Sequence, residues 1–300
     1  MSPAPPLISV VIPTHNRLKL VMRALQSVHD QTYPNIEIIV VDDSSTEDLS
    51  SITNTFKNTR IIRNNVSRGA QKSRLRGTEE SKGEFVALLD SDDWWEPEKL
   101  QKQYEAFLAN NPSLVSCQVN ITNELRSGII VPKQVFSGGQ VANFLFADHG
   151  ILQTSTFFSK KEILEDLLRK SADTKVHNDP SVVIECEKAE IAIVQLPEAL
   201  TCCDFTVRGD RISLDPSKIE ASREWFRHYG ANWNESLKRS YLFYHEVPRL
   251  IACGWYAQAL QLMIKNYSPT FSLKVTFKYI LKMLGVDFIR KNLNFRRLSN

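Results

Sequence analysis

The chain has 300 residues, of which 42% are hydrophobic and 24% are charged, with a formal net charge of +3. This composition is typical of a soluble globular chain of one large or two modest domains, and the small net charge excludes a generally nucleic-acid-binding surface. No run of about eighteen consecutive apolar residues is present and the N-terminus does not resemble a signal peptide, so we expect a cytoplasmic protein. Five cysteines without a C-x-x-C pair predict reduced, mostly buried thiols.

The first part of the chain alternates predicted strands with predicted helices. Apolar, β-branched runs predict strands over residues 7–12, 36–41, 60–63 and 85–89, and helical spacing of apolar residues predicts helices over 20–28 and 70–80. This alternation predicts an α/β fold with a doubly wound, mainly parallel, Rossmann-like sheet. Polar clusters at Pro13, Asp42 and Asp90 follow three of the strands, at the edge where such sheets bind ligands.

The second part is less regular. The pattern predicts a strand over 154–158, helices over 160–169 and 180–189, a strand over 191–195, and only helices from about Asp215 onward. The last helices are basic and amphipathic. A helix of this kind either lies on an anionic membrane face or exposes its lysines to solvent above a packed core, and both interpretations stay open.

Three carboxylates, Asp90, Asp92 and Asp93, directly follow the strand that ends at Leu89. Acids this close repel one another unless a cation or hydrogen-bond donors compensate. No His or Cys is adjacent, so the oxygen ligands favour Mg²⁺ or Mn²⁺, whose remaining positions substrate phosphates commonly fill. The alternative is an acidic first turn of the helix that Pro97 begins.

Several motifs occur in a fixed order: ISVVIPTHN from Ile8, QTYP from Gln31, EIIVVDDSS from Glu37, a segment around Gly69 and Arg74, and LLDSDDWWEP from Leu88. Together they resemble the family 2 glycosyltransferases of the GT-A fold. The resemblance implies a GT-A domain over residues 1–214, with a nucleotide-binding half (1–110) and an acceptor half (111–214). The helical region over 215–300 falls outside the resemblance.

The resemblance implies a nucleotide site at the ends of the first two strands. Pro13, Thr14 and Arg17 match the loop that touches the nucleotide. Asp42 matches the acid that accepts a hydrogen bond from the base, commonly uracil, and Asp43 is expected to support the ribose side.

The resemblance also implies a diphosphate site. Gly69 permits close backbone approach, and Arg74 resembles a basic residue near the diphosphate. Asp90 and Asp92 match the DxD pattern around Ser91: Asp92 is expected to bind the metal directly, and Asp90 to contact ribose or the metal through water. Asp93 is expected to support the loop.

A loop further along the chain completes the expected donor site. Arg211, together with Arg208, resembles a mobile loop that closes over the diphosphate and excludes water. The alternative is a solvated charge pair with Asp210.

The family uses a carboxylate on the acceptor side as general base, usually within an acidic pair that starts a short helix. The matching place is Asn178 and Asp179, and Asp179 is the predicted catalytic base. Asn178 replaces the usual first acid, which leaves one titratable group. The alternative role for Asp179 is to cap the helix that begins at Pro180, and both roles can coexist.

The resemblance therefore implies an inverting transferase that moves a sugar from a nucleotide diphosphate donor, expected to be UDP-linked, with Mn²⁺ or Mg²⁺. The expected acceptor is a saccharide, lipid-linked or protein hydroxyl, in cell-surface polysaccharide or glycan synthesis. We also expect peripheral contact with the inner membrane face through the basic C-terminal helices. Two alternatives stay open: a non-catalytic nucleotide-sugar or carbohydrate-binding module, favoured by Asn178, and a sugar nucleotidyltransferase, which normally needs a Gly- and Lys-rich loop after the first strand.

Overall fold

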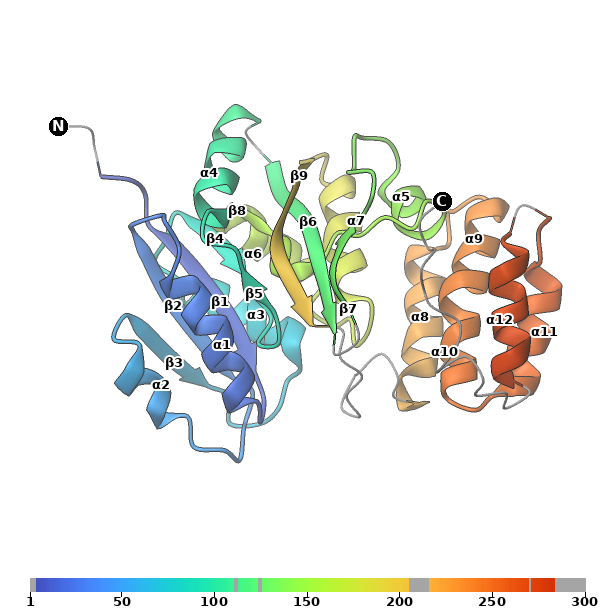
Figure 1. Cartoon of the computed structure of the whole chain (residues 1–300), viewed down its shortest axis with the longest axis horizontal. Coiled ribbons are helices and arrows are strands. Elements are labelled where there is room, and N and C mark those ends of the chain that lie inside the picture. The colour runs from blue at the N-terminus through green and yellow to red at the C-terminus, as the bar shows by residue number, and fades with distance from the viewer. Residues whose placement is uncertain (1–3, 111–112, 124–125, 205–215, 270, 284–300) are drawn as a thin grey trace. The chain divides into compact units, whose positions relative to one another are not determined.

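The computed structural model describes residues 4–110, 113–123, 126–204, 216–269 and 271–283 (Figure 1). The chain forms two compact units, residues 1–209 and 210–300. The boundary predicted at residue 214 and the predicted loop residues Arg208, Asp210 and Arg211 lie outside the described residues.

Within its described residues, the first unit is built on one nine-stranded sheet of order β3-β2-β1-β4-β8-β6-β9-β5, with β7 paired to β6. Strands β3, β2, β1 and β4 are parallel, whereas β8 runs antiparallel to β4 and β6. The strands are β1 (Ile8–Thr14), β2 (Ile36–Asp42), β3 (Thr59–Arg63), β4 (Phe85–Leu88), β5 (Trp94–Trp95), β6 (Ser113–Asn123), β7 (Arg126–Val131), β8 (Phe158–Lys160) and β9 (Ala192–Asp204). The predicted α/β class with a mainly parallel sheet is confirmed.

Helices cover both faces of this sheet because the central strands are apolar on both sides. Val10 and Ile12 of β1 pack in one core cluster with α1, whereas Val11 between them contacts α3. The helices are α1 (Leu18–His29), α2 (Ser50–Thr55), α3 (Ala70–Glu79), α4 (Lys99–Ala109), α5 (Val141–Phe146), α6 (Lys161–Lys170) and α7 (Asn178–Lys188).

Helix α3 lies unusually close to the sheet at Gly77. A Cβ atom there would lie 2.4 Å from Cγ1 of Val11 and 2.9 Å from Cγ2 of Val41, so only glycine fits this contact. Arg74 is one turn earlier on the same helix, and its height above the sheet is therefore fixed by backbone packing.

The predicted strand over 154–158 is wrong in its first part. Residues Thr154–Thr156 form a short 3₁₀ turn, η1, and strand β8 begins only at Phe158. The hydroxyl groups of this turn bind side chains and main-chain atoms of neighbouring loops, which stabilises the turn instead of an extended ladder.

In its described residues, the second unit contains only helices, in agreement with the pattern predicted from Asp215 onward. They are η3 (Pro216–Lys218), α8 (Ile219–Tyr229), α9 (Glu235–Tyr241), the π-helical turn η4 (Leu242–Glu246), α10 (Val247–Ala252), α11 (Tyr256–Asn266) and α12 (Leu273–Met283). This unit has its own core, in which Phe243, Val247, Leu250, Ala259 and Met263 are buried.

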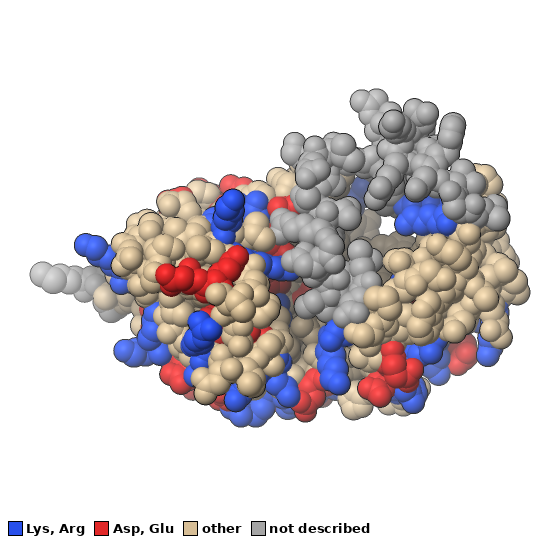
Figure 2. Space-filling model, turned by 90° about the horizontal axis from the view of Figure 1, so that it is seen from below, with Lys and Arg blue, Asp and Glu red and all other residues tan. Residues whose placement is uncertain are grey.

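All five cysteines are free thiols, and four of them are buried, as expected. On the face drawn in Figure 2, Lys and Arg side chains are interspersed with Asp and Glu, as the small net charge leads one to expect. None of the described helices combines the length and the apolar character needed to cross a membrane.

Candidate active site

The polar clusters that follow the parallel strands meet at one edge of the sheet. Strands β1 and β2 end in register at Thr14 and Asp42, and β4 ends at Leu88, two residues before Asp90. Parallel strands thus deliver the predicted site residues to the same place.

Asp42 is buried and already has partners. Its Oδ1 accepts a hydrogen bond from the backbone N–H of Ser45 at 2.8 Å, and its Oδ2 lies 3.1 Å from Nη1 of Arg63. Arg63 ends strand β3 directly opposite Asp42 in the parallel register. Nearby, the buried hydroxyl of Thr14 lacks a hydrogen-bond partner among the described residues. The strand ends thus hold one satisfied acid and one unsatisfied hydroxyl.

Asp43 organises the loop that leads into α3. Its carboxylate accepts hydrogen bonds from Asn64 and Ser73 and, in the loop before α3, from Ser67 and from the backbone N–H groups of Arg68 and Gly69. Burial raises the pKa of Asp43, but these bonds outweigh burial and leave the pKa below its ordinary value. Asp43 is therefore charged at neutral pH and fixes the backbone around Gly69.

Gly69 has φ +84°, a left-handed conformation that favours glycine, and a Cβ atom added there would meet no other atom within 4 Å. Its backbone N–H is held by Asp43 at 2.9 Å. The loop thus presents bare backbone to open space at the start of α3.

The two outer acids of the DxD segment each pair with an arginine. Arg74 of α3 donates to Oδ1 of Asp90 at 2.5 Å and 3.2 Å, and Nη1 of Arg17 lies 3.1 Å from Oδ2 of Asp92. Arg74 is buried. Burial lowers its pKa, but Asp90, Asp179 and Asp92 outweigh burial and raise it, so the guanidinium stays charged.

Asp93 faces the protein interior instead. Its Oδ2 accepts hydrogen bonds from Ser155 Oγ at 2.6 Å and Gln153 Nε2 at 2.9 Å. Burial, reinforced by Asp90 and Asp92, raises the pKa of Asp93 well above its ordinary value. Ser155 also accepts a hydrogen bond from the backbone N–H of Asp90 at 3.0 Å. Asp93 thereby ties the DxD loop to turn η1.

Asp179 lies in the first turn of α7 and belongs to the same electrostatic cluster. The helix begins at Asn178, not at Pro180, and its cap residue is His177, which makes no side-chain capping bond. Asp179 accepts a hydrogen bond from the hydroxyl of Thr154 in η1. Burial and Asp90 raise its pKa, against the opposing effect of Arg74. Asp179 therefore bonds to the turn that supports the DxD loop.

The sequence of the first unit matches the family model described as Glycosyl transferase family 2 over residues 9–168. The chain belongs to this family. The matched residues include both strand-end acids, Gly69, Arg74 and the DxD segment, and the resemblance inferred from the motifs is confirmed.

The chain is similar in sequence to named glycosyltransferases of Escherichia coli. The putative colanic acid biosynthesis glycosyl transferase WcaA of Escherichia coli K12 is 33% identical over 278 residues, covering 87% of this chain and 95% of WcaA. The UDP-Glc:α-D-GlcNAc-diphosphoundecaprenol β-1,3-glucosyltransferase WfaP of E. coli is 41% identical over 99 residues. That match covers 32% of this chain and only 39% of WfaP.

The fold of the family 2 chain is also found in solved structures. The crystal structure of S. aureus TarS 1–349 in complex with UDP-GlcNAc superposes with a TM-score of 0.63 at 18% identity, covering 97% of this chain and 93% of TarS 1–349. This similarity supports the GT-A fold.

The described residues do not form a metal site by themselves, because they contain no group of three or more His, Cys, Asp or Glu side chains arranged to hold an ion. A magnesium-like ion held by one carboxylate and by substrate phosphates needs no such group. Asp92, the predicted metal ligand, is partly exposed, whereas the neighbouring Asp93 is buried and already bonded. The residues are thus compatible with an ion shared with a diphosphate, which Asp92 would hold.

Two contributors to this family 2 site were not predicted. Arg23 of α1 donates to the backbone carbonyl of Asp92 at 2.5 Å, and its guanidinium lies 4.2 Å from the ring centre of Trp94. Arg63 pairs with Asp42, and its position at the end of a predicted strand is the signal that could have revealed this. Arg23 lies in an ordinary amphipathic helix, and its sequence context carries no comparable signal.

Proposed function

We propose that this family 2 glycosyltransferase transfers a sugar from a UDP-sugar to a hydroxyl acceptor with inversion at the anomeric carbon. The main support is the electrostatic cluster of Asp179, Arg74 and Asp90, in which a carboxylate of raised pKa interacts with the acids at the sheet edge where the nucleotide is proposed to bind. The titles of the TarS complexes and the name of WfaP, which refer to UDP-GlcNAc, UDP and UDP-Glc, support the choice of donor.

Donor binding is proposed to exchange partners within the site. The uracil would reach Asp42 and Thr14, and the diphosphate would approach the bare backbone at Gly69 and compete for the guanidinium groups of Arg17 and Arg74. Asp92, released from Arg17, would hold Mn²⁺ or Mg²⁺. Such an ion neutralises charge on a leaving diphosphate.

Asp179 is proposed to remove the proton of the acceptor hydroxyl. As the new C–O bond forms on one face of the sugar, the bond to the diphosphate breaks on the other face, and the proton passes to Asp179. A raised pKa brings a carboxylate closer to the operating pH and makes it a better general base. One displacement inverts the anomeric centre.

The proposed acceptor is a lipid-linked saccharide hydroxyl in cell-surface polysaccharide synthesis. WfaP carries a diphosphoundecaprenol-linked acceptor in its name, and other relatives are named for amylovoran and colanic acid synthesis. The product would be a lipid-linked glycan longer by one sugar.

The test is a panel of UDP-sugars assayed for UDP release with Mn²⁺, with Mg²⁺ and with chelator, in the presence of lipid-linked saccharides. Asp179→Asn is expected to lower turnover by a factor on the order of 10²–10⁴ while UDP affinity stays nearly unchanged. Asp92→Ala is expected to weaken metal-dependent UDP binding. Asp173→Asn, at an acid whose side chain is 93% exposed, is the matched control and should behave as wild type.

Equal loss of UDP binding in the Asp179 and Asp92 variants would contradict the division of roles. Measurable UDP binding without turnover of any donor would favour the non-catalytic module on the same fold.

A further inference from the structure

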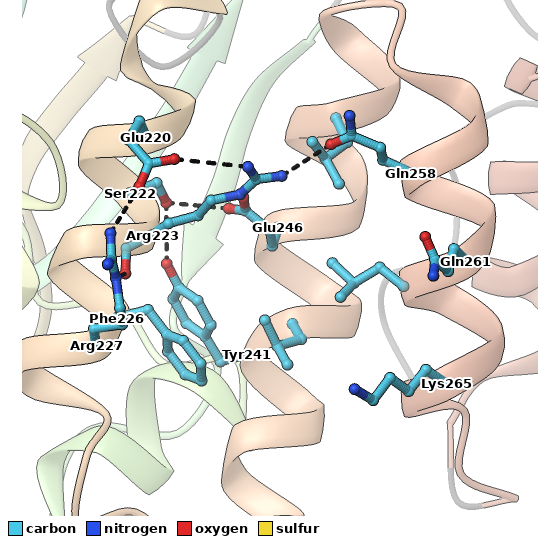
Figure 3. A pocket seen from close by; sticks show the side chains of 13 residues that line it. Glu220, Ser222, Arg223, Phe226, Arg227, Tyr241, Glu246, Gln258, Gln261 and Lys265 are labelled. Carbon is cyan, nitrogen blue, oxygen red and sulfur yellow. Dashed lines mark hydrogen bonds and ion pairs between the residues drawn. The ribbon is translucent and has the colours of Figure 1, made fainter.

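Helix α11 exposes apolar side chains beside its exposed polar ones. Gln258, Gln261 and Lys265 point into a pocket of about 780 Å³ within the helical unit (Figure 3). About a third of a turn away around the helix, Leu260 is 44% exposed and Ile264 is 69% exposed. A helix at a protein surface normally places its polar side chains outward and its apolar ones inward. The exposed apolar side of α11 therefore requires an explanation.

Helix α12 continues this pattern with two adjacent rows of side chains at a spacing of four residues. The first row is apolar, with Leu273 72% exposed and Phe277 61% exposed. The second row consists of Lys274, Lys278 and Lys282. The opposite sides of both helices are already used, because Ala259, Met263 and Tyr279 lie in the same core cluster. The exposed rows are thus not needed for packing this core.

The charge of this segment has one sign. From Val247 to Met283 the sequence contains Arg249 and four lysines but no Asp or Glu. Among the described residues, neither Lys274 nor Lys282 is in an ion pair. Ion pairs of this unit that lie before Val247 include Arg227 with Glu220 and Lys238 with Glu235. Helices α11 and α12 therefore combine exposed apolar side chains with lysines and contain no acidic residue.

We propose that the outward sides of α11 and α12 bind the surface of an anionic lipid bilayer. We call this surface the lipid face; it comprises Tyr256, Leu260, Ile264, Leu273, Lys274, Phe277 and Lys282. Its apolar side chains would enter the boundary between headgroups and acyl chains, and its lysines would contact lipid phosphates.

The charge of the lipid face argues for a membrane as the partner and against a second copy of the chain. Two such faces would bring positive charges together without acids to offset them, whereas anionic lipids supply the opposite charge. The partly exposed aromatic residues Trp255, Tyr256 and Tyr267 suit the same location, because Trp and Tyr favour the membrane interface. The proposal does not depend on the transferase reaction.

The experiment is co-sedimentation of the full chain with vesicles of phosphatidylcholine alone and of phosphatidylcholine mixed with phosphatidylglycerol, without donor. Wild type is expected to bind the anionic vesicles, and added salt is expected to weaken binding. Lys274→Gln combined with Lys282→Gln should weaken binding by roughly 25-fold, about fivefold for each lysine. Leu273→Gln combined with Phe277→Gln should weaken it at least about tenfold.

The controls make the same chemical changes in the first unit. Lys57→Gln with Lys82→Gln removes two exposed lysines, and Val66→Gln with Leu108→Gln removes two exposed apolar side chains. Both control pairs should bind vesicles as wild type does, and all variants should retain the wild-type far-UV circular dichroism and UDP affinity.

Three vesicle results would overturn the proposal: no binding to anionic vesicles, equal binding to neutral vesicles, or equal effects of the control and lipid-face variants. A lipid-free dimer that dissociates in the Leu273 and Phe277 variant would also overturn it, because a second copy would then cover the face. Absence of transfer to any acceptor would leave the vesicle result unchanged and would count only against the proposed function.

Discussion

Asp179 differs from the other acids at this edge of the sheet in the charges and hydrogen-bond donors around it. Asp43 receives five hydrogen bonds, and Asp90 and Asp92 each pair with an arginine. Asp179 has Thr154 as its hydrogen-bond donor, and the like charge of Asp90 acts on it against the opposite charge of Arg74. The carboxylate is therefore stabilised less than its neighbours. The pKa of Asp179 is therefore raised, while the hydrogen bond from Thr154 still holds its carboxylate in position.

The pH dependence of activity should report this balance. Asp179 must be deprotonated to act, so activity is expected to fall as pH drops through a pKa that lies above the ordinary value for Asp. Thr154→Val removes a donor that lowers this pKa, so the acid limb of kcat/KM should move to higher pH. Thr53→Val, at an exposed threonine of α2, is the matched control. An acid limb that stays in place would show that another group controls it.

At the scale of elements, Asp43 joins the end of β2 to the start of α3. Its five donors come from Asn64 just after β3, from the segment 67–69 and from Ser73 on α3. Each of these segments is polar and would be poorly fixed by apolar packing alone. One buried carboxylate therefore sets the position of the glycine loop.

Asp43→Ala is expected to lower the free energy of unfolding by about 3 kcal/mol, because several buried donors lose their acceptor together. The pKa of Asp43 is lowered in the folded state, so its contribution is present above the unfolded pKa and is lost as pH falls through the folded pKa. Urea unfolding at neutral pH and at low pH measures both effects. Asp148→Ala is the control, because Asp148 is an exposed acid; equal losses in the two variants would contradict the role of Asp43.

The sequence predicted the elements whose pattern is strong. Strands β1 to β4 and helices α1, α3 and α6 lie within about two residues of their predicted bounds, because apolar runs and helical periodicity directly reflect burial. Strands β5, β6 and β7 were not predicted. Strand β6 mixes buried Ser113 and Ser116 with apolar residues. The Ser116 hydroxyl bonds to Thr156 and the Ser113 carbonyl accepts a hydrogen bond from Ser159, and a local sequence pattern does not carry such tertiary contacts.

The same limit applies to the candidate site. Motifs located Asp42, Gly69 and Asp90, since these residues lie beside recognisable strands and turns. The pairing of Arg74 with Asp90 and of Arg17 with Asp92 depends on distances across the sheet edge, which sequence spacing does not determine. The hydrogen bond from Thr154 to Asp179 joins turn η1 to helix α7, which are far apart in the sequence, so the sequence could not predict it either.

At the scale of the whole molecule, the buried side chain of Lys99 lowers the free energy of unfolding when it is protonated. Lys99 of α4 is fully buried, its Nζ donates to Gln103 Oε1 at 2.5 Å and lies 3.8 Å from the ring centre of Trp95. Burial lowers the pKa of Lys99 to about 7. Below that pH the folded state must hold a buried charge, and between this pKa and the unfolded value near 10.5 it binds fewer protons than the unfolded state.

The contribution of Lys99 to stability should therefore rise as pH increases from about 7 to about 10. Lys99→Met is expected to raise the free energy of unfolding at pH near 6.5 by about 1–3 kcal/mol, although Gln103 loses a donor, and to flatten its increase with pH. Differential scanning calorimetry across this pH range measures the effect. The exposed Lys57→Met serves as control, and parallel curves for wild type and Lys99→Met would refute the assignment.

Gly77 also affects the candidate active site, because the absence of a Cβ atom at this position sets how closely helix α3 approaches the sheet. Helix α3 can contact the sheet this closely only because residue 77 has no Cβ atom. Arg74 extends from the same helix toward Asp90. Any larger residue at 77 would lift the helix and carry the guanidinium away with it. Substitution at position 77, on the buried side of α3, is thus limited by the need to keep Arg74 within hydrogen-bonding distance of Asp90.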